Sequence, residues 1–410
     1  MMENMTTAPP PLSEVSAQAV QDLEQQYLVQ NYSRYPLALE RGKGCYVYDL
    51  AGKRYLDFLA GIGVNALGHA HPRIVKTIRD QAGKLIHASN LYYNMYQGPL
   101  AKKLAEASGL NRTFFANTGS EAVEGALKMA RAYAHEKDPG RHEMIALENS
   151  FHGRTLGALS VTGQPKYRAP FEPLVPGVKF VPANDEAALE AAFSDRTACM
   201  IMELVQGEGG IVPMTAQFAA KARELADRHG ALLIFDETQC GVGRPGTYFS
   251  YQNLNPMTMP DIAVAAKPVA CGLPLGFILA NERAAAAFKP GTHGSTFGGG
   301  PLACRVGLEF FEILDGLLPK IQQMGLYFRQ KLEDLARKHS FVKEVRGFGL
   351  MVGVELTVPG KQLVLDGIAA GLLFNCTHDT VLRFLPPYIV EEKDVDKAVG
   401  ILAKLFKKVK

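Results

Sequence analysis

The sequence lacks the features that mark several large classes of protein. Its 410 residues contain no apolar run near the roughly 18 residues that a membrane-spanning helix needs. No C-x-x-C pair and no histidine cluster at metal-ligand spacing are present, which argues against a zinc site. The six cysteines are scattered along the chain, so we expect reduced thiols in the cytoplasm and no disulfide scaffold.

The charge balance and the first residues argue against further classes. The net charge of +3 is too small to indicate a nucleic acid or an acidic membrane as partner. The N-terminus has neither a basic n-region nor an apolar h-region and it lacks arginine, so we expect no secretory signal and no mitochondrial transit peptide. We expect residues 1–12 to form a flexible tail. Walker A, H-E-x-x-H and G-x-S-x-G motifs are all missing.

What is present is the alternating pattern of an α/β protein. The length predicts two or three packed subdomains. From about residue 72, short apolar runs alternate with amphipathic helical patterns such as 121–133, which predicts a large domain with a mainly parallel sheet. Examples of the apolar runs that we interpret as strands are 113–117, 143–148, 198–203, 231–236 and 261–266.

The two ends of the chain show a different pattern. A helical stretch over about 13–32 precedes a predicted hairpin whose turn is Ala51-Gly52. A helix over about 302–317 leads into a smaller α+β domain, which contains residues 341–356 and a final helix at 391–408. We therefore divide the chain into a tail (1–12), an N-terminal segment of the small domain (13–71), a large domain (72–310) and a C-terminal small domain (311–410).

Lys267 and Asp236 carry the clearest chemical signal. Each stands at the end of a short apolar run that reads as a buried strand. A lysine that forms a Schiff base, together with a carboxylate that keeps a pyridine nitrogen protonated, is what pyridoxal 5'-phosphate (PLP) requires. Most lysines are solvated surface charges, but Asp261 is the one other charged residue within ten positions of Lys267. Burial would help this amine to lose its proton.

For Asp236, the alternative is a helix N-cap after a strand. The following residues, E-T-Q-C-G-V-G-R-P-G, do not have a helical pattern, which weakens that alternative. Gln239 could donate a hydrogen bond to the phenolic oxygen of the cofactor ring. The segment 241–246 (G-V-G-R-P-G) matches a dinucleotide fingerprint, but no helix is predicted after it, so we discount a nicotinamide cofactor.

Two further segments are candidates for binding the cofactor and the substrate. In N-T-G-S-E-A, Gly119 and Ser120 open a helix and could bind a phosphate, although Ser120 could equally be a plain N-cap. In F-H-G-R-T, Phe151 could stack on a flat ring and Arg154 could bind a carboxylate. The alternative for Arg154 is an exposed loop arginine. Thr296 offers further donors for a phosphate.

Taken together, these segments resemble the fold-type I PLP enzymes, and within them the class III, or ω-amino-acid, aminotransferases. The resemblance extends from about residue 35 to the C-terminus. It implies a large α/β domain, a smaller α+β domain, PLP as cofactor and a homodimer with active sites at the interface. Its motifs are F-L-A-G-I-G-V-N-A-L-G-H-A-H-P, F-F-A-N-T-G-S-E-A, F-H-G-R-T, Q-G-E-G-G, D-E-T-Q-C-G-V-G-R, the Lys267 segment, H-G-S-T-F-G-G-G-P-L and L-R-F-L-P-P.

The resemblance also implies roles for single residues. Lys267 would bind the cofactor covalently, Asp236 would pair with its pyridinium nitrogen, and Phe151 would stack on its ring. Two departures from the family pattern concern the loops beside these residues. Leu204 replaces a usual proline, and Pro268-Val-Ala-Cys replaces a stretch that is glycine-rich in many members.

The remaining roles concern the phosphate and the substrate. By the same resemblance, Gly119 and Ser120 would hold the phosphate together with the partner subunit's Thr296. Arg154 would bind the substrate carboxylate that is distant from the reacting carbon, with Ser295 nearby.

An aminotransferase must accept two different substrates in one pocket, and two residues offer a solution. The resemblance places Arg383 beside the reacting carbon, where it would bind the near carboxylate of glutamate. Glu208 would pair with Arg383 when an amine donor without that carboxylate is bound. Breaking a desolvated pair of this kind is worth a few kcal/mol, which is enough to change specificity.

The substrates themselves are predicted by resemblance alone. The segments V-N-A-L-G-H, S-N-L-Y-Y-N and F-N-C-T-H-D-T-V-L-R-F-L-P-P are most similar to members of the class that use acetylornithine and 2-oxoglutarate. Ornithine, 4-aminobutyrate, succinylornithine and succinyl-diaminopimelate are the alternative donors. A catalytically silent binding protein and an NAD(P)-binding enzyme are alternatives of a different class.

Overall fold

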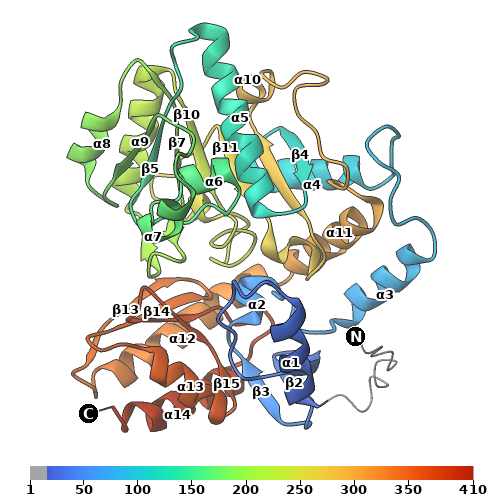
Figure 1. Cartoon of the computed structure of the whole chain (residues 1–410), viewed down its shortest axis with the longest axis vertical. Helices are drawn as coiled ribbons and strands as arrows, with labels where there is room; N and C mark the ends of the chain where they lie inside the picture. Colours follow the sequence, from blue (N-terminus) through green and yellow to red (C-terminus); the bar gives the residue numbers. More distant parts are fainter. Residues whose placement is uncertain (1–15, 410) are drawn as a thin grey trace, which may run out of the picture.

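The computed structural model describes residues 16–409, so the predicted tail at 1–12 lies outside the described residues. Figure 1 shows two bodies, one built on a seven-stranded sheet and one built from two four-stranded sheets. No helix of the described part of the chain is long and apolar enough to cross a membrane. Residues 16–409 also contain no group of three or more side chains that could hold a metal ion.

The seven-stranded sheet has the order β4-β12-β11-β10-β7-β5-β6. β12 is antiparallel to both of its neighbours, and every other neighbouring pair is parallel. This confirms the predicted α/β fold with a mainly parallel sheet. β6 and β12 are further strands beyond the five runs given as examples. The strands are β4 (Arg112–Ala116), β5 (Glu143–Leu147), β6 (Val178–Val181), β7 (Thr197–Met202), β10 (Leu232–Asp236), β11 (Ile262–Ala265) and β12 (Gly276–Ala280).

Helices cover this sheet, so its central strands are buried on both faces and appear in the sequence as unbroken apolar runs. The helices of this body are α3 (Pro72–Ala82), α4 (Gln97–Ser108), α5 (Gly119–Lys137), α6 (Leu156–Ser160), α7 (Pro165–Arg168), α8 (Glu186–Ala192), α9 (Ala216–His229), α10 (Glu282–Ala285) and α11 (Pro301–Asp315). Short 3-10 turns occur at η2 (Ala169–Phe171), η3 (Ser250–Asn253) and η4 (Lys267–Ala270).

The second body combines both ends of the chain. Its first sheet, β1-β2-β3-β15, joins N-terminal strands to a C-terminal one, because β15 pairs in parallel with β3. The second sheet has the order β13-β14-β17-β16. The elements are β1 (Leu39–Lys43), β2 (Tyr46–Asp49), β3 (Arg54–Asp57), β13 (Val342–Phe348), β14 (Met351–Leu356), β15 (Leu372–Leu373), β16 (Asn375–Thr377), β17 (Val381–Phe384), α12 (Leu318–Ala336), α13 (Lys361–Ala369) and α14 (Glu392–Phe406).

The predicted hairpin is present as β2 and β3. Its turn is stabilised by Asp49, whose carboxylate accepts hydrogen bonds from the backbone N–H groups of Ala51 and Lys53. The helix predicted at 302–317 is α11, which continues across the predicted domain boundary at 310/311. The domain boundaries themselves stay a prediction.

The first helix is shorter than predicted. The prediction was residues 13–32, whereas α1 covers Ala17–Tyr27 and Leu28 is already extended. The amide of Gln30 folds back and donates to the carbonyls of Gln25 (3.3 Å) and Leu28 (2.7 Å). These bonds satisfy carbonyls that a longer helix would have used, so the helix ends early.

Candidate active site

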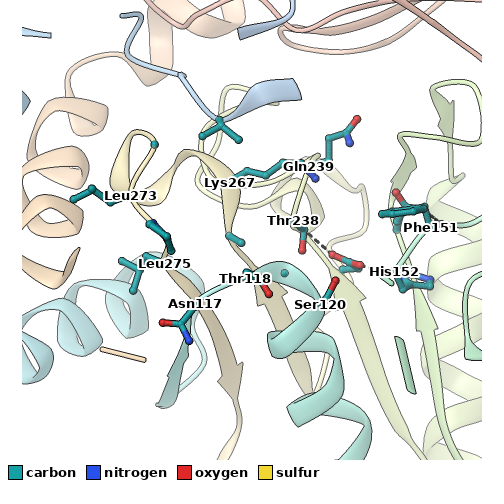
Figure 2. A pocket seen from close by; sticks show the side chains of 18 residues that line it. Asn117, Thr118, Ser120, Phe151, His152, Thr238, Gln239, Lys267, Leu273 and Leu275 are labelled. Carbon is teal, nitrogen blue, oxygen red and sulfur yellow. Dashed lines mark hydrogen bonds and ion pairs between the residues drawn. The ribbon is translucent and has the colours of Figure 1, made fainter. Parts of the chain in front are cut away.

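A cavity of about 370 Å³ opens where the parallel strands end. Its walls come from the segments that follow β4, β5, β7, β10 and β11, which all leave the same edge of the sheet. Ligands of open α/β sheets bind at this edge. Figure 2 shows the side chains of Lys267, Gln239, Thr238 and Ser120 gathered above the start of α5, with Phe151 and His152 beside them.

Lys267 follows β11 and begins the 3-10 turn η4. Its φ of 47° lies in the left-handed region, a costly conformation for a side-chain-bearing residue that is typical of functional sites. Burial lowers the pKa of the Lys267 amine, although the nearby carboxylates of Asp236 and Glu208 oppose this effect. The Pro268 departure from the family pattern is accommodated at the second position of η4, which leaves Lys267 facing the cavity.

Asp236 is the last residue of β10 and is buried. Its Oδ2 lies 2.8 Å from Nδ1 of His152, and its Oδ1 accepts a hydrogen bond from the backbone N–H of Thr238. No helix follows Asp236, so the alternative of a helix N-cap is wrong. The prediction had no role for His152, although it stands beside Phe151 in the F-H-G-R-T motif.

The N-terminus of α5 forms one end of the cavity. The helix is capped by Thr118, whose side chain accepts from the N–H of Glu121, so the interpretation of Ser120 as a plain N-cap is wrong. A Cβ at Gly119 would lie 2.7 Å from Cγ2 of Thr238, which explains why glycine is required there. Thr238 lines the cavity, and its Oγ1 is buried with no hydrogen-bond partner among the described residues.

Phe151 and Glu203 form the side of the cavity that is contributed by β5 and β7. The backbone N–H of Phe151 donates to Oε2 of Glu203, and the N–H of Gly207 donates to Oε1 of the same carboxylate, each at 3.0 Å. Burial raises the pKa of Glu203 to about 7. Leu204, the second departure from the family pattern, is buried, and its carbonyl accepts from the N–H of Met214.

Four polar side chains contact one another near Lys267: those of Arg383, Glu208, Gln239 and Asn375. Arg383, on β17, is 1% exposed, and its Nη1 contacts Oε1 of Glu208 at 2.5 Å and Oε1 of Gln239 at 3.0 Å. Its Nε donates to Oδ1 of Asn375. Burial acts to raise the pKa of Glu208, but the charge of Arg383 and its hydrogen bond outweigh this and hold it below the usual value. The predicted pairing of Glu208 with Arg383 is therefore present in the structure.

The other three predicted residues lie farther out. Arg154 is exposed, and its guanidinium lies 4.1 Å from the centre of the Tyr167 ring. The Oγ of Ser295 accepts a hydrogen bond from the side chain of Asn117, and Thr296 is exposed. Neither Ser295 nor Thr296 lines the cavity of this chain.

The donors of the cavity match the chemistry of PLP. A helix N-terminus with an approachable glycine and an unpartnered threonine hydroxyl suits a phosphate. A buried carboxylate, an aromatic side chain and a lysine with a lowered pKa suit a protonated pyridine ring that bears an aldehyde.

Comparison with known proteins also indicates an enzyme that uses PLP. The family model for aminotransferase class-III matches residues 27–406. The chain belongs to the class-III aminotransferases. This aminotransferase is 49% identical to the acetylornithine aminotransferase of Methanocaldococcus jannaschii, over 95% of this chain and 98% of that protein. It is 46% identical to the acetylornithine aminotransferase of Aquifex aeolicus, over 93% of this chain and 100% of that protein.

Solved structures extend the likeness to the fold of the aminotransferase. The ornithine aminotransferase of Toxoplasma gondii has a TM-score of 0.91 and 33% identity, covering 96% of this chain and 95% of that one. The acetylornithine aminotransferase of Elizabethkingia anophelis has a TM-score of 0.85 and 31% identity, covering 96% and 99%. A further structure of the Toxoplasma enzyme has partial occupancy of PLP at its active site. PLP is the cofactor of the class, and the cavity of this aminotransferase fits it.

The segment G-V-G-R-P-G at 241–246 does not have the structure of a dinucleotide-binding motif in this aminotransferase. Residues 241–246 form a loop that does not lead directly into an α-helix, so the loop offers no helix N-terminus for a pyrophosphate. Arg244 of this loop is buried, and its Nη1 donates to the carbonyls of Leu350 and Pro386. The motif therefore joins the two bodies of the aminotransferase.

Proposed function

We propose that this aminotransferase moves the δ-amino group of acetylornithine to 2-oxoglutarate, giving N-acetylglutamate semialdehyde and glutamate, in arginine biosynthesis. The observation that carries the proposal is the Arg383–Glu208 pair beside Lys267, because it lets one pocket accept substrates with and without a near carboxylate. The names of the relatives at 43–49% identity over nearly the whole chain support acetylornithine as the donor.

We assign the chemical step to three residues. Bound PLP would withdraw electrons from the substrate carbon that carries the amino group. The Nζ of Lys267, with its lowered pKa, would take the proton from that carbon as a general base. Asp236 would hold a proton at the ring nitrogen of the cofactor, and His152 would keep the carboxylate of Asp236 in place.

The cofactor would be held at its two ends by different elements. The first N–H groups of α5 at Gly119 and Ser120 would bind the phosphate, together with the hydroxyl of Thr238. Phe151 would stack on the ring. The Oε1 of Gln239 accepts from Arg383, which leaves its amide N–H groups to donate to the phenolic oxygen.

We propose that Glu208 and Arg383 act as a gate between the two half-reactions. With acetylornithine bound, Glu208 neutralises Arg383, because no carboxylate lies near the reacting carbon of this donor. With 2-oxoglutarate or glutamate, the near carboxylate displaces Glu208 from Arg383. The distant carboxylate of either substrate would bind Arg154, which is exposed and has no carboxylate partner among residues 16–409. Ser295 would assist at this position.

We also propose that the active enzyme is a cytoplasmic homodimer in which the partner subunit's Thr296 completes the phosphate site. Large apolar side chains stand exposed next to Thr296 and in one nearby segment, which is unusual for a surface that meets only water. They are Leu91, Tyr92, Tyr93, Met95 and Phe297. The six free cysteines fit a reducing compartment. Sedimentation should give twice the mass of one chain; a monomer that remains fully active would contradict the dimer.

The substrate is tested by the visible spectrum of the purified enzyme with PLP. Acetylornithine should remove the cofactor's visible absorption band, and 2-oxoglutarate should restore it. Ornithine is the donor to compare, because the Toxoplasma ornithine aminotransferase has the higher TM-score of the two solved relatives described above. If ornithine or 4-aminobutyrate alone removes the band, the site assignment survives and the proposed donor is wrong. If no band forms, the proposed roles of Lys267 and Asp236 are wrong.

A further inference from the structure

The loop that carries Glu208 is fastened at several points along its backbone. We call residues 206–211 the gate loop. From the large body, Oε1 of Glu203 accepts the N–H of Gly207, and the side chain of Gln206 donates to the carbonyl of Glu148 at 2.8 Å. These contacts fix the beginning of the gate loop, and its two ends are joined because Gln206 of β8 (Val205–Gln206) pairs with Val212 of β9 (Val212–Pro213).

Arg346 holds the second half of the gate loop. It lies on β13, and its side chain is 13% exposed. Its Nε donates to the carbonyls of Gly210 (3.1 Å) and Ile211 (3.0 Å), and its Nη2 donates to Gly210 at 2.7 Å. The remaining Nη1 contacts the carboxylates of Glu344 and Glu355. These carboxylates point the guanidinium toward the loop and balance its charge.

A second anchor contacts Glu208 directly. The hydroxyl of Thr377, on β16, donates to the backbone carbonyl of Glu208 at 2.6 Å. β13 and β16 belong to the same four-stranded sheet as β17, which carries Arg383. One sheet therefore carries Arg383 and also binds the backbone of Glu208. Glu208 itself belongs to the other body, in a segment that follows β7 and β8 (Val205–Gln206).

We propose that Arg346 and Thr377 are positioning residues that set the balance between the two half-reactions by holding Glu208 against Arg383. This inference rests on the gate proposed above. With the backbone of the loop held, Glu208 can leave Arg383 by rotation of its side chain alone and returns to the same position. A loosened loop would spend less time with Glu208 paired. Arg383 would then be unpaired when the amine donor binds, whereas binding of 2-oxoglutarate no longer requires a pair to be broken.

Two variants weaken the anchors in different ways. In Arg346→Lys, a single ammonium group cannot serve two carbonyls and two carboxylates at once. In Thr377→Val, the shape of the side chain is kept, but the carbonyl of Glu208 loses its donor. The matched control is Arg337→Lys, the same exchange at a side chain that is 67% exposed, pairs with Asp334 and has no hydrogen bond to the gate loop.

The measurement is the single-turnover rate of each half-reaction in the PLP-loaded enzyme. We expect both variants to slow the acetylornithine half-reaction about fivefold to tenfold, which corresponds to the loss of one or two hydrogen bonds, and to change the 2-oxoglutarate half-reaction less than about twofold. The control should change neither. Amide hydrogen exchange of residues 206–211 in the loaded enzyme without substrate should be faster in both variants and unchanged in the control.

The outcomes separate this inference from the gate on which it rests. If Glu208→Ala slows both half-reactions equally, the gate is wrong and the inference falls with it. If Glu208→Ala is selective but the two anchor variants slow both half-reactions equally, or leave exchange of the gate loop unchanged, the inference alone is overturned. If Arg346→Lys does not fold, Thr377→Val decides between these outcomes.

Discussion

Oδ2 of Asp236 lies 2.8 Å from Nδ1 of His152, and both side chains are buried. The two residues are separated by 84 positions in the sequence and meet because β5 and β10 end at the same edge of the sheet. The other ring nitrogen, Nε2, has no hydrogen-bond partner among the described residues. The imidazole ring of His152 therefore makes its hydrogen bond to Asp236 and holds that carboxylate in the orientation that the cofactor ring would meet.

Asp236→Asn tests the carboxylate. An amide cannot hold a proton on the ring nitrogen by charge, and removing one member of a buried, hydrogen-bonded pair of charges typically costs 2–5 kcal/mol. We expect kcat/KM to fall by about 10²–10³-fold while the protein stays folded. The control is Asp227→Asn, at a side chain that is 57% exposed. Activity within a few-fold of the unchanged enzyme would show that Asp236 does not act on the cofactor.

Lys267→Ala tests the proton-transfer group. A positioned general base contributes about 10²–10⁴-fold to a rate, so we expect at least that loss in steady-state activity. The melting temperature of the cofactor-free protein should not fall, because the lowered pKa of Lys267 shows that burial disfavours its charged form. Lys338→Ala, on the surface, serves as the control. Residual activity above a hundredth of normal would contradict the role.

Glu208→Ala tests the gate. Without the carboxylate of Glu208, Arg383 is left as a buried cation with no carboxylate partner, beside the position that we propose for the reacting carbon. We expect the half-reaction with acetylornithine to slow at least about tenfold more than the half-reaction with 2-oxoglutarate. Rapid mixing with each substrate in turn measures the two rates separately. Equal losses in both rates would refute the gate.

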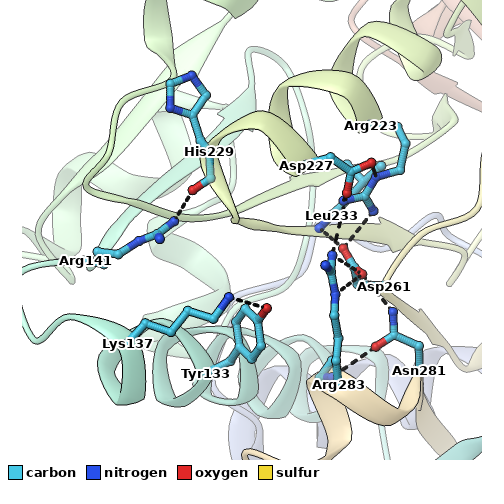
Figure 3. A network of polar contacts seen from close by, with 11 residues as sticks. Tyr133, Lys137, Arg141, Arg223, Asp227, His229, Leu233, Asp261, Asn281 and Arg283 are labelled. Carbon is cyan, nitrogen blue, oxygen red and sulfur yellow. Dashed lines mark hydrogen bonds and ion pairs between the residues drawn. The ribbon is translucent and has the colours of Figure 1, made fainter.

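Asp261 is the centre of a polar network at the opposite end of the strands from the cavity (Figure 3). Its carboxylate accepts from the side chains of Arg223 (2.7 Å), Arg283 (2.6 Å) and Asn281 (2.8 Å), and from the N–H of Leu233 (2.9 Å). Burial acts to raise the pKa of Asp261, but Arg223, the hydrogen bond from the backbone N–H of Leu233 and Arg283 outweigh it and hold the pKa below its usual value.

This network predicts a stability that depends on pH. Because the pKa of Asp261 is lower in the folded protein than in the unfolded chain, the stabilisation is present at neutral pH and is lost as pH falls through the folded pKa. We expect Asp261→Asn to destabilise the protein by about 2–4 kcal/mol at pH 7. The difference in melting temperature should shrink below about pH 4. A difference that does not change with pH would mean that the charge of Asp261 is unimportant.

The sequence by itself determined the central strands and the residues at their ends. The runs before Asp236 and Lys267 are apolar because both faces of the parallel sheet are covered, and this pattern is local in the chain. The runs singled out in the sequence did not include β6, a four-residue strand that contains Lys179, or β12, which follows the glycine-containing turn after Lys267. The predicted end of the first helix was also too late: in the structure the side chain of Gln30 satisfies the carbonyls of Gln25 and Leu28, which a longer helix would have used.

Only the tertiary structure decided which side chains meet. The contacts of His152 with Asp236, of Glu203 with Phe151 and of Arg346 with Gly210 join positions that are 84, 52 and 136 residues apart. Local patterns specify helices, strands and turns, but the order of strands in a sheet decides which loops become neighbours. Lys267 and Asp236 could therefore be found from the sequence. The residues that position them could not, and neither could the residues that position the gate.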